Sequence, residues 1–173
     1  MTIRAAVIGA SFAKAAYLPA LKTIEDVEIV AVSSARLASA QAAAQTFGVA
    51  NAYDDYREML DKHAVDLVGI ATPTVHHAPM TFAALDAGAH VLCEKPMAMN
   101  ADEARQMLDR AEALGRVHAI GHELRFNPNR RKIRDLIASG FIGQVRHINM
   151  VNINASWGDP ASRPAGDGWS LAS

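Results

Sequence analysis

The sequence has 173 residues, of which half are hydrophobic and a fifth are charged, and its formal net charge is −1. This composition is typical of a folded domain, and the near-neutral charge argues against a nucleic acid or an anionic membrane surface as the main partner. The single cysteine cannot form an internal disulfide bond, the first residues do not resemble a signal peptide, and no apolar stretch is long enough to span a bilayer. We therefore expect a cytoplasmic protein that binds small ligands.

Five short apolar runs predict β-strands, and alanine-rich segments with helical spacing separate them. Because the runs are continuously hydrophobic, we expect helices on both faces of the sheet. The sequence thus predicts an α/β fold, a Rossmann-type doubly wound parallel sheet, over residues 1–123. Asn100 and Glu103 predict the capped start of one helix. The predicted strands are Ile3–Ile8, Val27–Ser33, Leu67–Ala71, His90–Glu94 and Val117–Gly121.

The pattern changes after residue 123. Pro128–Ser139 predicts a helix, and Gly143–Ser156 predicts a longer strand with rough alternation of apolar residues. From Trp157 onward, glycine and proline predict loops. We interpret residues 124–173 as the beginning of a second α/β domain. One helix and one strand make a poor core by themselves, so we expect the chain to be the first part of a longer protein.

A glycine-containing turn follows the first predicted strand. Gly9 fits the first glycine of the dinucleotide-binding fingerprint, whereas Ser11 stands at the second glycine and Lys14 at the third. The Ser11 hydroxyl and the N–H groups at a helix start can bind phosphate, so the turn, with Phe12 inside it, is a candidate pyrophosphate site. An ordinary strand-to-helix turn explains the same residues equally well.

The end of the second predicted strand indicates which dinucleotide would bind. NAD sites carry an acidic residue about 20 residues after the glycine turn, but this strand ends in Ser33 and Ser34, and Arg36 follows. Two hydroxyls and a guanidinium can bind a 2′-phosphate, which favours NADP. The alternative is that Ser33 caps the next helix and Arg36 is a solvated residue of its first turn.

The fourth predicted strand ends in Glu94, Lys95 and Pro96. Ligands of open α/β sheets bind beyond the carboxyl ends of the strands, so a lysine placed there is a candidate for chemistry. The alternative is a surface salt bridge of small energy. The bond between Lys95 and Pro96 is also a candidate cis peptide bond.

Several segments occur together in a characteristic order and spacing: Val7–Ser11 with Leu18–Leu21, Ala71–Pro73 with His77, Ala87–Val91, Glu94–Pro96 and Arg125–Pro128. In combination, these segments resemble the Gfo/Idh/MocA oxidoreductases. The resemblance covers essentially the whole chain, and it is most specific in the proline-bearing loop Ala71–Pro73, the Glu-Lys-Pro run and the crossover segment Arg125–Pro128.

The resemblance implies a Rossmann domain that holds a nicotinamide dinucleotide, for which we expect NADP with NAD as the other possibility. It also implies a following domain that shapes the substrate pocket and often mediates homo-oligomers. The implied reaction is hydride transfer to or from a hydroxyl or carbonyl carbon of a sugar, cyclitol or related small polyol, with an aspartate and a histidine expected beyond Trp169. The expected cofactor-binding residues are Gly9, Ser11, Phe12, Ser33, Ser34, Arg36, Thr72, Pro73, His77, Glu94 and Lys95.

Lys95 is the expected catalytic residue. Oxidising an alcohol places negative charge on its oxygen, which a nearby ammonium stabilises while it helps to relay the proton. Glu94 can orient this lysine.

Three alternatives remain open at this point. The same fold can serve a non-catalytic protein that senses a nucleotide or binds a partner. A metal-dependent hydrolase would need a metal site, but the histidines, with Cys93 and Glu94, match no compact zinc signature, and we expect no metal. Cys93 itself is interpreted as a packing residue, with a nucleophile as the alternative.

Overall fold

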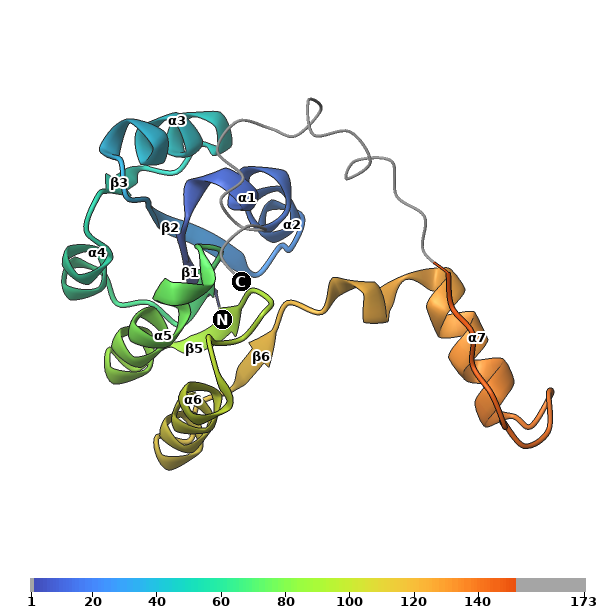
Figure 1. Cartoon of the computed structure of the whole chain (residues 1–173). Coiled ribbons are helices and arrows are strands. Elements are labelled where there is room, and N and C mark those ends of the chain that lie inside the picture. Colours follow the sequence, from blue (N-terminus) through green and yellow to red (C-terminus); the bar gives the residue numbers. More distant parts are fainter. Residues whose placement is uncertain (1, 152–173) are drawn as a thin grey trace, which may run out of the picture. The chain divides into compact units, whose positions relative to one another are not determined.

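The computed structural model describes residues 2–151. The chain divides into two compact units, Met1–His122 and Glu123–Ser173. The first unit contains a six-stranded parallel sheet with the strand order β3-β2-β1-β4-β5-β6 (Figure 1). This order is that of a Rossmann-type doubly wound sheet, because the direction of winding reverses between β1 and β4. The strands are β1 (Ile3–Ile8), β2 (Val27–Ser33), β3 (Asn51–Tyr53), β4 (Leu67–Ile70), β5 (His90–Cys93) and β6 (His118–Ile120).

The continuous apolar runs form the strands as predicted. β1 and β2 have the predicted bounds, and β4, β5 and β6 are one or two residues shorter than their predicted ranges. The three-residue strand β3 was not predicted, because Asn51, Ala52 and Tyr53 form no apolar run. It forms through pairing with β2, and the Asn51 side chain donates a hydrogen bond to the Val30 carbonyl at 2.9 Å.

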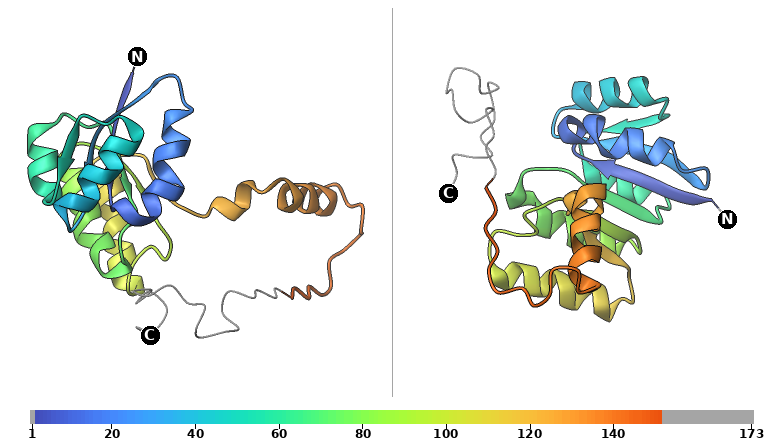
Figure 2. Two further views of the ribbon diagram at one scale, coloured as in Figure 1. Left: turned by 90° about the horizontal axis from the view of Figure 1, so that it is seen from above. Right: turned by 90° about the vertical axis from the view of Figure 1, so that its right-hand side faces the viewer.

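Helices cover both faces of the sheet. The two faces of the sheet contribute to two separate cores: Val7 and Val32 pack with α1, α2 and α3, whereas Ala6 and Ile8 pack with α4, α5 and α6. Figure 2 shows α3 in cyan beside the blue α1–α2 pair. The helices are α1 (Ala10–Ala15), α2 (Tyr17–Lys22), α3 (Leu37–Phe47), α4 (Tyr56–Lys62), α5 (His77–Asp86) and α6 (Ala101–Ala113), with a 3₁₀ turn η1 (Thr74–His76) before α5.

The predicted cap of α6 is present. The Asn100 side-chain oxygen accepts a hydrogen bond from the Glu103 N–H at 2.9 Å, and the Glu103 carboxylate accepts one from the Met99 N–H at 3.0 Å. These bonds satisfy N–H groups that have no partner within the helix. Among residues 2–151, no helix has both the length and the apolar character needed to cross a membrane.

The second unit begins with the 3₁₀ turn η2 (Glu123–Phe126) and the helix α7 (Pro128–Ala138), which confirms the predicted helix. The Asn127 side chain caps α7 by accepting hydrogen bonds from the N–H groups of Asn129 and Arg130. Proline at the first helical position fits because its missing N–H is not needed there.

The predicted strand Gly143–Ser156 is wrong over residues 143–151, and its remaining residues lie outside the described part of the chain. Ile148 and Met150 are 76% and 77% exposed, and no strand within residues 2–151 pairs with this segment. A strand needs a neighbour for its backbone hydrogen bonds and a surface for its apolar side chains. The apolar pattern alone supplies neither.

Candidate functional site at the carboxyl edge of the sheet

The sheet register brings the predicted site segments to one edge. Ile8 lies opposite both Ser33 and Ile70, and Ile70 lies opposite Cys93. The residues that follow these strand ends therefore emerge at the same edge, on both sides of the point where the winding reverses. Ligands of such sheets bind at this edge.

Gly9 occupies a backbone position that only glycine can take. Its φ is 105°, and a Cβ added there would overlap the Ala71 carbonyl oxygen and lie 3.1 Å from the Thr72 Cγ2. The Gly9 N–H donates to the Ser33 carbonyl at 2.8 Å. The turn thus packs directly against the ends of β2 and β4.

The rest of the turn leaves polar groups accessible. Ser11, Phe12 and Lys14 are exposed on α1, whereas Ala13 is fully buried against the sheet. Lys14 therefore does not obstruct helix packing although it stands at the third glycine position of the fingerprint. This close approach of backbone and helix start is what a diphosphate needs.

The tip of β2 presents Ser34 and Arg36. Ser33 is buried, Ser34 is half-buried and Arg36 is exposed. The alternative that Ser33 caps α3 is wrong: Arg36 itself is the N-cap residue, and no side chain caps this helix. No acidic residue stands between Ser33 and Leu37, so a 2′-phosphate would meet no carboxylate from this tip.

His77 joins two loops of the site from within the protein. It is fully buried, and its two ring nitrogens lie 2.7 Å from the Thr72 carbonyl oxygen and 2.9 Å from the Pro96 carbonyl oxygen. Thr72 is 8% exposed, whereas Pro73 is exposed. His77 therefore faces the backbone of both loops, and Pro73 faces solvent at the edge.

Glu94, Lys95 and Pro96 follow β5 at this edge. Glu94 is buried, Lys95 is exposed, and the peptide bond between Lys95 and Pro96 is cis, as the sequence suggested. The Glu94 carboxylate accepts hydrogen bonds from the Tyr17 hydroxyl and from the Lys95 backbone N–H, both at 3.1 Å. The acid therefore fixes the backbone of the lysine that follows it.

Tyr17 was missed at the sequence level. It begins α2, within an alanine-rich segment that predicted only a covering helix, and its partner Glu94 is 77 residues away. One signal in the sequence could have pointed to it. A buried tyrosine hydroxyl usually has a hydrogen-bond partner, and Tyr17 stands on the face of the predicted helix that packs against the sheet.

Cys93 is a buried packing residue. Burial is the largest cause that raises the pKa of its thiol to about 12 from 9.0. A thiol with such a pKa is protonated at neutral pH and is a poor nucleophile. Within the described residues, no group of three or more histidine, cysteine, aspartate or glutamate side chains is arranged to hold a metal ion.

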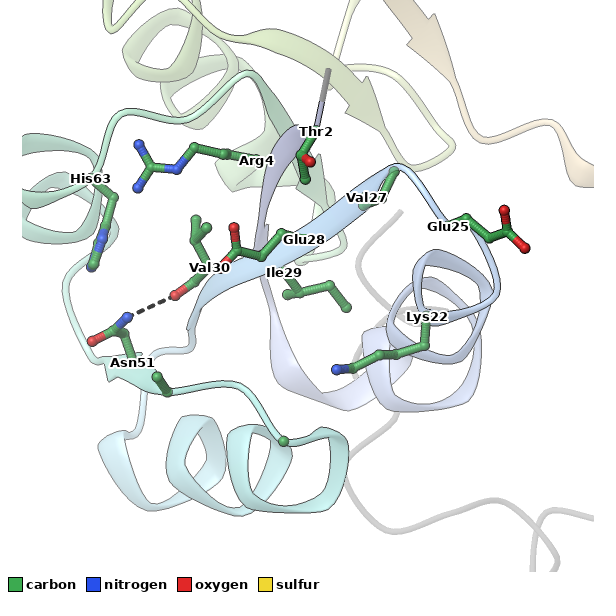
Figure 3. A pocket seen from close by; sticks show the side chains of 12 residues that line it. Thr2, Arg4, Lys22, Glu25, Val27, Glu28, Ile29, Val30, Asn51 and His63 are labelled. Atoms are coloured by element: carbon green, nitrogen blue, oxygen red, sulfur yellow. Dashed lines mark hydrogen bonds between the residues drawn. The ribbon is translucent and has the colours of Figure 1, made fainter.

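A hollow of about 540 Å³ lies at the opposite end of the strands (Figure 3). Arg4 and Glu28 line it from the first halves of β1 and β2, and Asn51 lines it from the start of β3. None of the predicted site residues lines this hollow. The candidate site is the carboxyl edge described above.

A family comparison agrees with this geometry. Residues 3–122 match the family model described as "Oxidoreductase family, NAD-binding Rossmann fold". The chain belongs to the Gfo/Idh/MocA oxidoreductases. Relatives of this family carry the names of dehydrogenases and reductases.

Three relatives illustrate the range of this Gfo/Idh/MocA family. The D-glucoside 3-dehydrogenase of Escherichia coli (strain K12) is 38% identical, over 83% of this chain and 41% of its own length. The dTDP-3,4-didehydro-2,6-dideoxy-alpha-D-glucose 3-reductase of Streptomyces violaceoruber is 39% identical, over 86% and 44%. A solved 3-ketoreductase from Actinomadura kijaniata in complex with NADP has a TM-score of 0.77 and 32% identity, covering 84% of this chain and 47% of that one. The chain thus spans less than half the length of each.

Proposed function

We propose that this chain is the nucleotide-binding portion of an NADP-preferring oxidoreductase that acts on a hydroxyl or carbonyl carbon of a sugar, cyclitol or related polyol. The observation that carries the proposal is the convergence of three segments at one sheet edge: the Gly9 turn, the tip of β2 and the Glu94–Lys95 end of β5. The substrate class is supported by relatives that are named for glucosides, sugar nucleotides and inositol.

The residues of this edge fit a dinucleotide. Gly9 and Ser11 would hold the pyrophosphate, because the turn has no Cβ to fill its space and the helix start offers N–H groups. Ser34 and Arg36 would hold the 2′-phosphate of the adenosine ribose. Thr72 and Pro73, whose loop packs against Gly9, would lie along the middle of the cofactor, with His77 holding that loop from behind.

Lys95 is the proposed catalytic residue. Bound at this edge, the nicotinamide ring supplies hydride chemistry. The Lys95 ammonium would stabilise negative charge on the substrate oxygen and give it a proton during reduction. During oxidation, the neutral Lys95 amine would take the proton of the hydroxyl group. Glu94 holds the lysine's backbone through the hydrogen bond to its N–H.

The cofactor assignment is tested by titrating NADPH and NADH into the protein by isothermal calorimetry. We expect NADPH to bind at least about tenfold more tightly, because the guanidinium of Arg36 forms a charge-assisted pair with the 2′-phosphate. Arg36→Ala should remove most of that preference, and Arg105→Ala, at an exposed position on α6, should leave it intact. An unchanged preference in Arg36→Ala would refute the role of this residue.

Testing the catalytic role of Lys95 requires a form of the protein that is active on a polyol substrate. There, Lys95→Ala should lower kcat by at least about 100-fold, since it removes a proton-transfer group, while the Kd for NADPH stays within about threefold. Near-normal turnover would remove Lys95 from the mechanism. Cofactor binding without any turnover by the unaltered protein would favour the nucleotide-sensing alternative.

A further inference from the structure

A buried carboxylate stands one residue before Lys95. Glu94 is 5% exposed, and each of its oxygens accepts one hydrogen bond, from the Tyr17 hydroxyl and from the Lys95 N–H. Both of these donors are neutral groups. An ionised carboxylate accepts hydrogen bonds and donates none, so two donors match the charged form of this side chain.

Two glycines make room for this pair. A Cβ at Gly69, in β4, would lie 2.7 Å from the Tyr17 ring, and a Cβ at Gly121, just after β6, would lie 2.5 Å from the Glu94 Oε1. The same Cβ at Gly121 would also lie 3.2 Å from the Tyr17 hydroxyl. The ring and the carboxylate therefore occupy space that two glycines leave open, one in β4 and one just after β6.

The pair also connects α2 with the Glu94–Lys95 end of β5. Alternation along β5 places Glu94 on the same face as Leu92, which packs against the core beneath α1 and α2. Tyr17 is the first residue of α2, and α1 separates it from the Gly9 turn. A negative charge is thus held at the carboxyl edge of β5, on the face where α1 begins.

We propose that the Tyr17–Glu94 pair makes this site prefer the oxidised, positively charged nicotinamide over the reduced, neutral ring. The inference rests on the proposed function, in which the adenosine half lies at the tip of β2 and the nicotinamide half therefore falls on the β4–β5 side. Glu94 acts through its charge without touching the ring. Tyr17 is a positioning residue that keeps the carboxylate in place.

The physical basis is the difference of one charge between the two redox forms. A fixed carboxylate attracts the cationic ring and has no such interaction with the neutral one, and the attraction persists over several ångströms in a partly buried site. Lys95 itself is unchanged in all the variants below. The ratio of the two affinities therefore isolates the contribution of Glu94.

The test measures Kd for NADP⁺ and NADPH by calorimetry in the unaltered protein, Glu94→Gln and Tyr17→Phe. We expect Glu94→Gln to shift the ratio of the two Kd values by about tenfold toward the reduced form. Tyr17→Phe should shift it in the same direction by a smaller factor, because the charge remains but loses its fixed position. Glu112→Gln, at an exposed position near the end of α6, is the matched control and should leave the ratio unchanged.

The outcomes separate this inference from the proposed function. A ratio that stays within twofold in both variants overturns the inference, whether the affinities are retained or fall equally for both redox forms, because equal loss shows a purely structural role. Tyr17→Phe removes one hydroxyl only, so it keeps the test decisive if Glu94→Gln does not fold. Failure of the unaltered protein to bind either form overturns the proposed function, and this inference with it.

Discussion

At the scale of single residues, Gly9 carries the heaviest steric constraint of the site. Gly9→Ala combines an unfavourable φ with an overlap between the new Cβ and the Ala71 carbonyl. Gly48→Ala is the matched control, since its φ of 62° is also positive but nothing lies within 4 Å of the added Cβ. We expect Gly48→Ala to cost about 1–2 kcal/mol of unfolding free energy and Gly9→Ala at least about 2 kcal/mol more, measured by urea unfolding. Equal losses would show that the overlap is relieved without cost.

Cys93 provides a second test at this scale. With its pKa raised to about 12 by burial, the native thiol has about a thousandth of the thiolate of an unfolded thiol at pH 8. Labelling with a chromogenic disulfide reagent should therefore be at least about 100-fold slower in the native protein than in urea. Between pH 7 and 9 the unfolded thiol becomes largely ionised, whereas the native thiol stays almost wholly protonated because both pH values lie well below its pKa. Native labelling within tenfold of the unfolded rate would contradict this account.

At the scale of elements, the cap of α6 contributes a definable share of stability. Asn100→Ala removes the hydrogen bond to the Glu103 N–H and should lower the unfolding free energy by about 1 kcal/mol, seen as a lower Tm. Gln106→Ala, at an exposed position within α6, retains the cap and should leave Tm nearly unchanged. If the two variants lose the same amount, the Asn100 bond is not what stabilises the helix start.

Elements differ in how well the sequence predicted them. β1 and β2 were predicted to the residue because the second part of each strand is buried on both faces, which requires a continuous apolar run. β3 was missed because its pairing with β2, rather than its composition, makes it a strand. The segment after Gly143 shows the opposite case. Its apolar pattern predicted a strand, but without a partner strand the described residues 143–151 form no strand.

At the scale of the whole molecule, the sequence predicted the site's segments but not all of its contacts. The positions of Gly9, Arg36 and Lys95 followed from strand ends, because parallel strands deliver their ends to one edge. The pairing of Tyr17 with Glu94 spans 77 residues and depends on two glycines, and no local pattern encodes it. Long-range contacts between side chains require the register of the sheet, which only the structure supplies.

The distribution of burial predicts where a protease cuts first. Both hydrophobic cores are formed by residues of the first unit, and no residue of the described segment 123–151 is buried. Brief trypsin digestion should therefore cleave first between Arg125 and Arg146 and leave a resistant fragment that contains all six strands, identified by mass spectrometry. Early cleavage at Lys22 or Arg57 would contradict this division of stability.

The central claim is that the Gly9 turn, the tip of β2 and the Glu94–Lys95 edge bind one extended dinucleotide. The most direct measurement is an amide ¹H–¹⁵N NMR titration of the protein with NADPH. We predict that the amides of Gly9, Ser34, Thr72 and Lys95 shift along a single binding curve, while those of Arg4 and Glu28, which line the hollow at the opposite end of the strands, do not. Shifts confined to that hollow, or separate curves for the three segments, would contradict the claim.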